Sequence, residues 1–121
     1  TAIGNDYGYD NVFSREIEAI ANPIDVIIAI TTSGNSSNIL KALDAAKIKK
    51  VFTVVLTGSG RGKLADDAIA LNIPSNDTAR IQECHILIGH MICGLVEEAI
   101  FGSKRLQRFK ITIWSKDERF Y

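Results

Sequence analysis

The stretch that decides the fold is DVIIAITTSGNSS, residues 25–37. Its first six residues form an apolar, β-branched run of strand length, which suits a buried parallel strand. Residues 38–47 follow with Ile39, Leu43 and Ala46 at helical spacing. We therefore predict a strand, a loop over residues 31–37, and a helix. Such a loop points the backbone N–H groups of the helix start, and the positive end of its dipole, toward an anion above the strand.

The 31–37 loop is rich in hydroxyl groups, and Gly34 permits a positive φ or a close backbone approach. Five of its side chains are hydroxyl donors: Thr31, Thr32, Ser33, Ser36 and Ser37. The loop has no lysine or arginine, which argues against a nucleotide P-loop and favours a monophosphate held by neutral donors. The alternative is that Asn35 or Ser36 merely caps the helix while the other polar residues are solvated.

Strand and helix patterns alternate along the rest of the chain. Residues 51–56 and 69–73 are expected to form two further strands, and residues 77–100 a long helix. Glycine-rich residues 58–62 are expected to form a βα turn rather than a second phosphate loop, because their spacing is not G-x-G-x-x-G. This order predicts an α/β fold with a parallel sheet flanked by helices and the 31–37 loop at the carboxyl edge of the sheet.

The amino-terminal residues are expected to begin with a turn-rich entry over residues 4–10 and to continue into a helix capped by Asp10 or Asn11. The inner face of that helix would carry four apolar residues: Val12, Phe13, Ile17 and Ile20. The chain opens at Thr1 as if in the middle of a fold, so we expect it to be incomplete at its amino terminus.

Charge and composition exclude several classes of function. The 14 basic residues balance the 14 acidic ones, so nothing calls for nucleic acid or an anionic membrane surface. No uninterrupted apolar run reaches the roughly 18 residues of a membrane span, and no secretory signal pattern is present. We therefore expect a cytoplasmic domain, in which Cys84 and Cys93 are buried, reduced thiols.

The predicted long helix places polar side chains among many apolar ones: Gln82, Glu83, His85 and His90. Histidine is suited to moving protons near neutral pH, and glutamine and histidine can both ligate a metal. The alternative is that these groups form hydrogen bonds inside a core or a subunit interface.

Five blocks of sequence resemble the sedoheptulose-7-phosphate isomerases, also called phosphoheptose isomerases, of the sugar isomerase (SIS) fold. They are AIGNDYGY (2–9), TSGNS (32–36), LTG (56–58), DTARIQE (77–83) and HILIGH (85–90). The resemblance implies that residues 1–101 are the carboxyl-terminal portion of a three-layer SIS domain, and that residues 102–121 are an atypical tail. In that tail, residues 110–114 could form an extra strand.

The resemblance implies an aldose–ketose isomerisation between sedoheptulose 7-phosphate and D-glycero-D-manno-heptose 7-phosphate, a step in making heptose for lipopolysaccharide. A proton would leave the carbon beside the carbonyl, an enediol would form, and the proton would return to the neighbouring carbon. By matching to the family, His90 would be catalytic, Gln82 and His90 would ligate Zn²⁺, and Gln82 would also contact substrate. Sugar and phosphate would be held by Asn5, Asp6, Thr31, Thr32, Ser33 and Ser36.

The sequence also departs from the family. The family helix that carries a catalytic glutamate and a histidine ligand has no match here, and Glu83 is not expected to replace that glutamate. Gln82 and His90 are separated by eight helical residues, a rise of about 12 Å, so a shared metal would stretch both side chains. An irregular helix start, or a substrate that bridges the two, would relieve that strain. His85 lies nearer to Gln82 but is expected to be a packing or interface residue.

The resemblance also implies a homotetramer with sites at subunit contacts. Two alternatives stay open at this level. One is a non-catalytic SIS protein that binds sugar phosphates or serves as a scaffold, like the relatives that associate with the replication initiator DnaA. The other is an isomerase for a different sugar phosphate, because the loop recognises phosphate rather than chain length.

Overall fold

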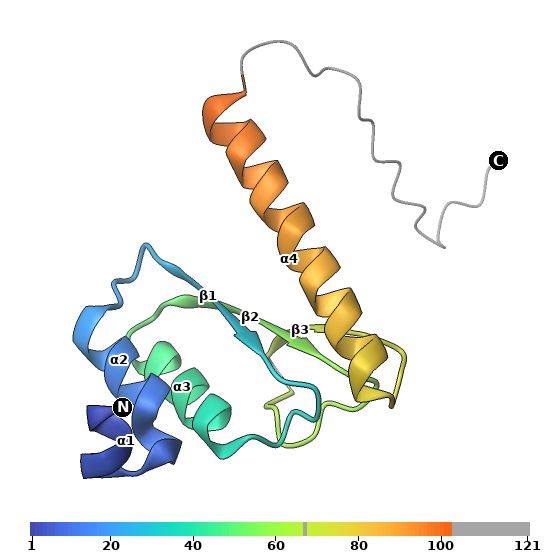
Figure 1. Cartoon of the computed structure of the whole chain (residues 1–121). Coiled ribbons are helices and arrows are strands. Elements are labelled where there is room, and N and C mark those ends of the chain that lie inside the picture. The colour runs from blue at the N-terminus through green and yellow to red at the C-terminus, as the bar shows by residue number, and fades with distance from the viewer. Residues whose placement is uncertain (67, 103–121) are drawn as a thin grey trace, which may run out of the picture. The chain divides into compact units, whose positions relative to one another are not determined.

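A computed structural model of the chain describes residues 1–66 and 68–102. The elements follow the order α1 (Ala2–Tyr7), a 3₁₀ turn (Tyr9–Asn11), α2 (Val12–Ile20), β1 (Val26–Ile30), α3 (Ser37–Ile48), β2 (Phe52–Thr57), β3 (Ile69–Asn72) and α4 (Thr78–Phe101). Figure 1 shows this order along the chain. The chain divides into two compact units, Thr1–Ile88 and Gly89–Tyr121.

The first unit contains a parallel sheet with strand order β1-β2-β3. Val26 pairs with Phe52 at the start of β1, and Ile30 pairs with Leu56 at its end. Val54 then pairs with Ile69 of β3. The predicted α/β fold with a parallel sheet is confirmed, and all three strands lie within a residue or two of their expected positions. The β-branched residues of β1 explain why this segment adopts strand rather than helix.

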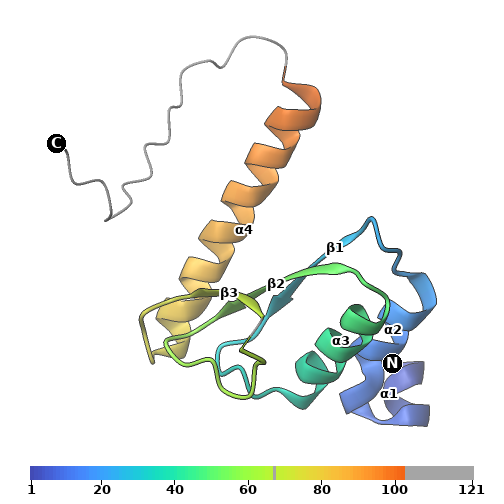
Figure 2. The same cartoon turned by 180° about the vertical axis from the view of Figure 1, so that it is seen from behind.

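Helix α3 covers one face of the sheet, and α2 packs against α3 (Figures 1 and 2). The core between α3 and the sheet is built on Ala29, Val55 and Leu64, with Ile39, Leu40, Leu43 and Ala70 packed around them. On α3, the small side chains Ala42, Ala45 and Ala46 are buried. Their size lets α3 approach its neighbours closely, and this packing holds the start of α3 above the end of β1.

The opposite face of the sheet carries apolar side chains that are 41–61% exposed. We call this set the open sheet face: Val26, Ile28, Ile30, Phe52, Ile69 and Leu71. Their register partners and two-residue spacing place them on one side of the sheet, since alternate residues of a strand point the same way. The unit therefore presents a contiguous apolar surface to its surroundings.

Two expectations about the amino-terminal residues were wrong. Residues 2–7 form helix α1 rather than a turn-rich entry. In α2, Val12 and Ile17 are half-buried as expected, but Phe13 is 39% and Ile20 is 70% exposed. The reason is that α2 packs mainly against α3 and the adjacent amino-terminal segment. These contacts bury only part of the apolar face of α2, and Phe13 and Ile20 lie outside that part.

Helix α4 is continuous over 24 residues and is long and apolar enough to cross a membrane, by length and composition only. This corrects the expectation from uninterrupted apolar runs, because a span tolerates a few polar residues within it. Length and composition alone do not assign a membrane role, since helices in subunit interfaces share them. In the second unit, Cys93 is exposed rather than buried, and in the first unit Cys84 is half-buried. The expected strand at residues 110–114 lies outside the described residues.

Candidate functional site

Hydrogen bonds made by its own hydroxyl side chains hold the 31–37 loop in shape. Thr31 is buried, and its backbone N–H donates to the Leu56 carbonyl at 3.0 Å as the chain leaves β1. The Thr31 Oγ1 atom accepts a hydrogen bond from the Gly34 N–H at 3.2 Å and lies 3.4 Å from the Ser36 Oγ atom. Ser33 is exposed, and its Oγ atom accepts from the Asn35 N–H at 3.1 Å. The structure thus brings together Thr31, Thr32, Ser33 and Ser36, the predicted phosphate ligands.

The N-cap residue of α3 makes no capping hydrogen bond, although Asn38 Oδ1 accepts from the Ile39 N–H at 3.0 Å in the first turn. Ser36 occupies the N-cap position, but its side chain makes no cap hydrogen bond and instead faces Thr31 Oγ1. The interpretation in which Ser36 serves merely as a helix cap is therefore wrong. The positive end of the α3 dipole and the N–H groups of Ser37 and Asn38 remain directed toward the loop, as an anion site requires.

A second loop, after β2, supports the first one by close backbone contact. A Cβ atom at Gly34, which has a φ of 67°, would lie 2.3 Å from the Arg61 carbonyl oxygen. One at Gly62 would lie 2.4 Å from the Ser33 carbonyl oxygen. The Lys63 N–H donates to the Gly34 carbonyl at 3.0 Å. Both glycines are required for this approach. The expected βα turn at residues 58–62 was wrong, because residues 58–66 and 68 contain no helix and the chain continues from β2 to β3.

The nearby arginine does not serve as a phosphate ligand in this arrangement. The Arg61 guanidinium donates to the carbonyl oxygens of Ala65 at 2.9 Å and Ala68 at 2.8 Å. The loop therefore offers neutral hydroxyl and backbone donors, as the sequence indicated.

The amino-terminal segment meets the start of α3 through residues that the sequence did not single out as binding residues. Ser37 Oγ donates to Asp10 Oδ1 at 2.6 Å, and Lys41 Nζ donates to Asn11 Oδ1 at 3.0 Å. The predicted sugar-binding residues, Asn5 and Asp6, are exposed on α1 and hydrogen-bonded to each other at 2.8 Å. No sequence signal distinguishes the Asp10 contact, because its partner lies 27 residues away along the chain.

In the first unit, the residues of α4 take distinct positions. Gln82 is exposed and lines a hollow of about 510 Å³ together with Ala79, Glu83 and Ile86. Glu83 forms an exposed ion pair with Arg80 at 2.6 Å, consistent with its exclusion as a catalytic base. Gln82 lies within the regular helix rather than at an irregular start. His85 is buried, as expected of a packing residue.

His90 is exposed in the second unit. Among residues 1–66 and 68–102, no three His, Cys, Asp or Glu side chains gather closely enough to hold a metal ion. Gln82 and His90 supply two donors, whereas a catalytic zinc site has three protein ligands. The described residues therefore do not fit Zn²⁺ by themselves.

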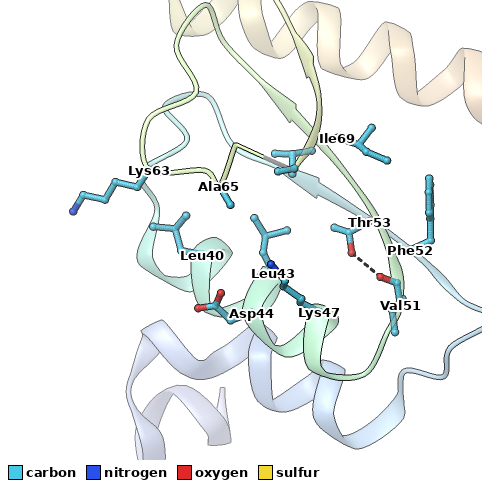
Figure 3. Close-up of a pocket in the computed structure, with 12 residues that line it drawn as sticks. Leu40, Leu43, Asp44, Lys47, Val51, Phe52, Thr53, Lys63, Ala65 and Ile69 are labelled. Carbon is cyan, nitrogen blue, oxygen red and sulfur yellow. Dashed lines mark hydrogen bonds between the residues drawn. The ribbon is translucent and has the colours of Figure 1, made fainter.

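A separate cavity of about 510 Å³ lies between α3 and the strands β2 and β3. Figure 3 shows Leu40 and Leu43 of α3 on one side of it and Thr53 of β2 on the other. Its walls are mainly apolar, and none of the predicted site residues lines it. The cavity is therefore distinct from the predicted phosphate site at the 31–37 loop.

Comparison with known proteins agrees with the geometry of the loop. A phosphoheptose isomerase from Sulfurimonas denitrificans is 56% identical over 103 residues, which are 84% of this chain and 53% of the relative. One from Rhodospirillum rubrum is 50% identical over 101 residues, 83% of this chain and 54% of the relative. The chain is similar to the phosphoheptose isomerases. It spans about half the length of the curated relatives it matches.

Solved structures support the same likeness. The phosphoheptose isomerase of Neisseria gonorrhoeae superposes with a TM-score of 0.73 at 45% identity, covering 78% of this chain and 55% of the other. The enzyme of Francisella tularensis gives 0.75 at 39% identity, covering 80% and 53%. No family model matches the chain. The resemblance to phosphoheptose isomerases expected from the sequence is therefore confirmed, together with the fold.

Proposed function

We propose that this chain acts in a phosphoheptose isomerase, which interconverts sedoheptulose 7-phosphate and D-glycero-D-manno-heptose 7-phosphate for lipopolysaccharide precursors. The observation that carries the proposal is the 31–37 loop, whose hydroxyl groups surround the start of α3 in a chain 56% identical to such an enzyme. The phosphate group would accept hydrogen bonds from Thr31, Thr32, Ser33 and Ser36 and from the N–H groups of α3.

The proposed reaction is a proton transfer between neighbouring carbons. A base removes the proton from the carbon beside the carbonyl, and the electron pair moves to form an enediolate. The hydroxyl proton of that carbon passes to the former carbonyl oxygen, and the carbon-bound proton is returned to the former carbonyl carbon as the new carbonyl forms. We assign the proton-carrying role to His90, because it matches the histidine of the family motif and its side chain is exposed. Gln82 would contact the substrate, and Asn5 and Asp6 would bind sugar hydroxyls.

The carboxylate base and a complete metal site are not assigned to described residues of this chain. The family glutamate has no match in this sequence, so the exchange experiment below tests turnover by the chain alone. Zn²⁺ bound by Gln82 and His90 stays a prediction that needs further ligands, and no step of the reaction is assigned to it. A chain that binds sugar phosphate without turnover would instead fit the non-catalytic SIS proteins.

Self-association and compartment belong to the same proposal. The open sheet face would be covered in a homo-oligomer, for which the resemblance implies a tetramer. The second unit carries further exposed apolar residues: Met91, Leu95, Val96, Ile100 and Phe101. The free thiols Cys84 and Cys93 suit the reducing cytoplasm.

The test is proton exchange in deuterated water. The chain is incubated with sedoheptulose 7-phosphate, with and without Zn²⁺, and exchange at the carbon beside the carbonyl is followed by proton NMR. We expect exchange that disappears in His90→Ala and persists in Glu97→Ala, a control at an exposed charged residue of the same helix.

A measurement of phosphate binding distinguishes the possible results if no proton exchange is seen. Absence of exchange, with phosphate-dependent binding that is lost in Ser33→Ala, would contradict turnover by this chain and favour a binding role. Absence of any binding would contradict the phosphate site itself.

A further inference from the structure

His85 is the buried polar group that the proposed reaction does not use. Its side chain belongs to a residue only 3% exposed, and its Nε2 atom lies 3.3 Å from the Thr57 carbonyl oxygen. A carbonyl oxygen can only accept, so Nε2 must carry the proton and donate. Nδ1 is then an acceptor, and it has no hydrogen-bond partner among the described residues.

Packing alone does not account for a histidine at this position. An apolar side chain of similar size would fill the same space without removing two ring nitrogens from water, and burial of an unpaired polar atom is unfavourable. The hydrogen bond to the Thr57 carbonyl offsets part of the cost of burying the imidazole. The function of His85 therefore follows from what this hydrogen bond does to the Thr57 backbone.

The peptide group between Thr57 and Gly58 joins three parts of the first unit. Its carbonyl oxygen accepts from His85 of α4 and also from the N–H of Ile73, just after β3, at 2.9 Å. The N–H of the same peptide group, on Gly58, donates to the Thr32 carbonyl of the phosphate loop at 3.1 Å. Hydrogen bonds at both ends of one peptide polarise it and strengthen each other.

Gly58 packs tightly against the backbone of the 31–37 loop. A Cβ atom at Gly58 would lie 2.6 Å from the Thr32 carbonyl oxygen and 2.8 Å from Ile81 Cδ1. Ile81 is 3% exposed and lies one helical turn before His85. A shift of the Thr57–Gly58 peptide therefore moves the Thr32 backbone with it.

We propose that His85 is a positioning residue, which holds the 31–37 loop in its anion-binding shape through the Thr57–Gly58 peptide. This inference rests on the proposed function, because the loop must bind phosphate for its shape to matter. His85 touches no reacting atom in this role. It determines how well the loop donors are aligned before the ligand arrives.

The experiment compares His85→Gln, His85→Asn and His85→Leu in the whole chain, with inorganic phosphate as the probe and affinity measured by NMR titration. The glutamine amide can place an N–H near the position of Nε2, whereas the shorter asparagine amide cannot. We expect a roughly five- to tenfold loss of affinity in His85→Asn and His85→Leu, the range for one lost hydrogen bond. His85→Gln should restore most of it.

Amide hydrogen exchange distinguishes positioning from general stability. The Gly58 amide should exchange faster in the Asn and Leu variants than in the Gln variant, while amides in β1 keep their rates. Equal affinity in the Gln and Asn variants, or equal acceleration of all amides, would overturn the positioning role. If the unmodified chain does not bind phosphate, the proposed function fails, and the Gly58 amide rate then decides the role of His85 independently.

Discussion

The contact between the phosphate loop and the turn after β2 predicts a large effect for Gly34→Ala. A left-handed φ costs an L-residue about 1–2 kcal/mol. The new Cβ atom would lie 2.3 Å from the Arg61 carbonyl oxygen, where real contacts stay above 3.0 Å, so the two backbones must separate by at least 0.7 Å (3.0 − 2.3). That separation weakens the bond from the Lys63 N–H to the Gly34 carbonyl, worth about 1 kcal/mol.

Reduced entropy of the unfolded chain offsets about 0.4–1 kcal/mol of this cost. The net destabilisation is therefore about 2 kcal/mol. With a urea dependence of about 1–3 kcal/mol per M, the unfolding midpoint should fall by roughly 0.7–2 M. Urea unfolding followed by circular dichroism measures this shift directly.

Gly60→Ala is the matched control, because a Cβ atom there meets nothing within 4 Å and Gly60 is not at a positive φ. We expect it to change the unfolding free energy by less than about 0.5 kcal/mol. If Gly34→Ala and Gly60→Ala gave equal midpoints, the close backbone contact between the two loops would be refuted.

Two further predictions concern the surface of the first unit. Arg80→Ala removes an ion pair whose side chains are 60% and 61% exposed, so it should change the unfolding free energy by less than about 1 kcal/mol; a larger loss in urea unfolding would contradict solvent screening of this pair. Ile28→Lys places a charge on the open sheet face and should lower the mass seen by light scattering, whereas Ile24→Lys, at a residue 92% exposed outside the strands, should leave it unchanged. Equal masses for the two variants would argue against association through this face.

The sequence predicted a helix or strand well where its formation depends only on neighbouring residues. The β-branched run of β1, the hydroxyl-rich loop and the helical spacing of α3 each depend on neighbouring residues. The predictions for Ile20 and Cys93 were wrong because exposure depends on what packs against a helix, and spacing shows only that a face is apolar. The role of Ser36 could be decided only when Thr31 was seen beside it.

By itself the sequence determined the positions of the three strands, the neutral character of the 31–37 loop and the likeness to phosphoheptose isomerases. These features depend on residues that are adjacent in the sequence or that belong to short motifs. The tertiary structure alone decided that Gly34 lies against Arg61, that the Thr57–Gly58 peptide joins β2 to the phosphate loop, and that His85 binds its carbonyl. His85 and Thr57 are 28 residues apart, and no local pattern specifies which distant backbone group a buried side chain will meet.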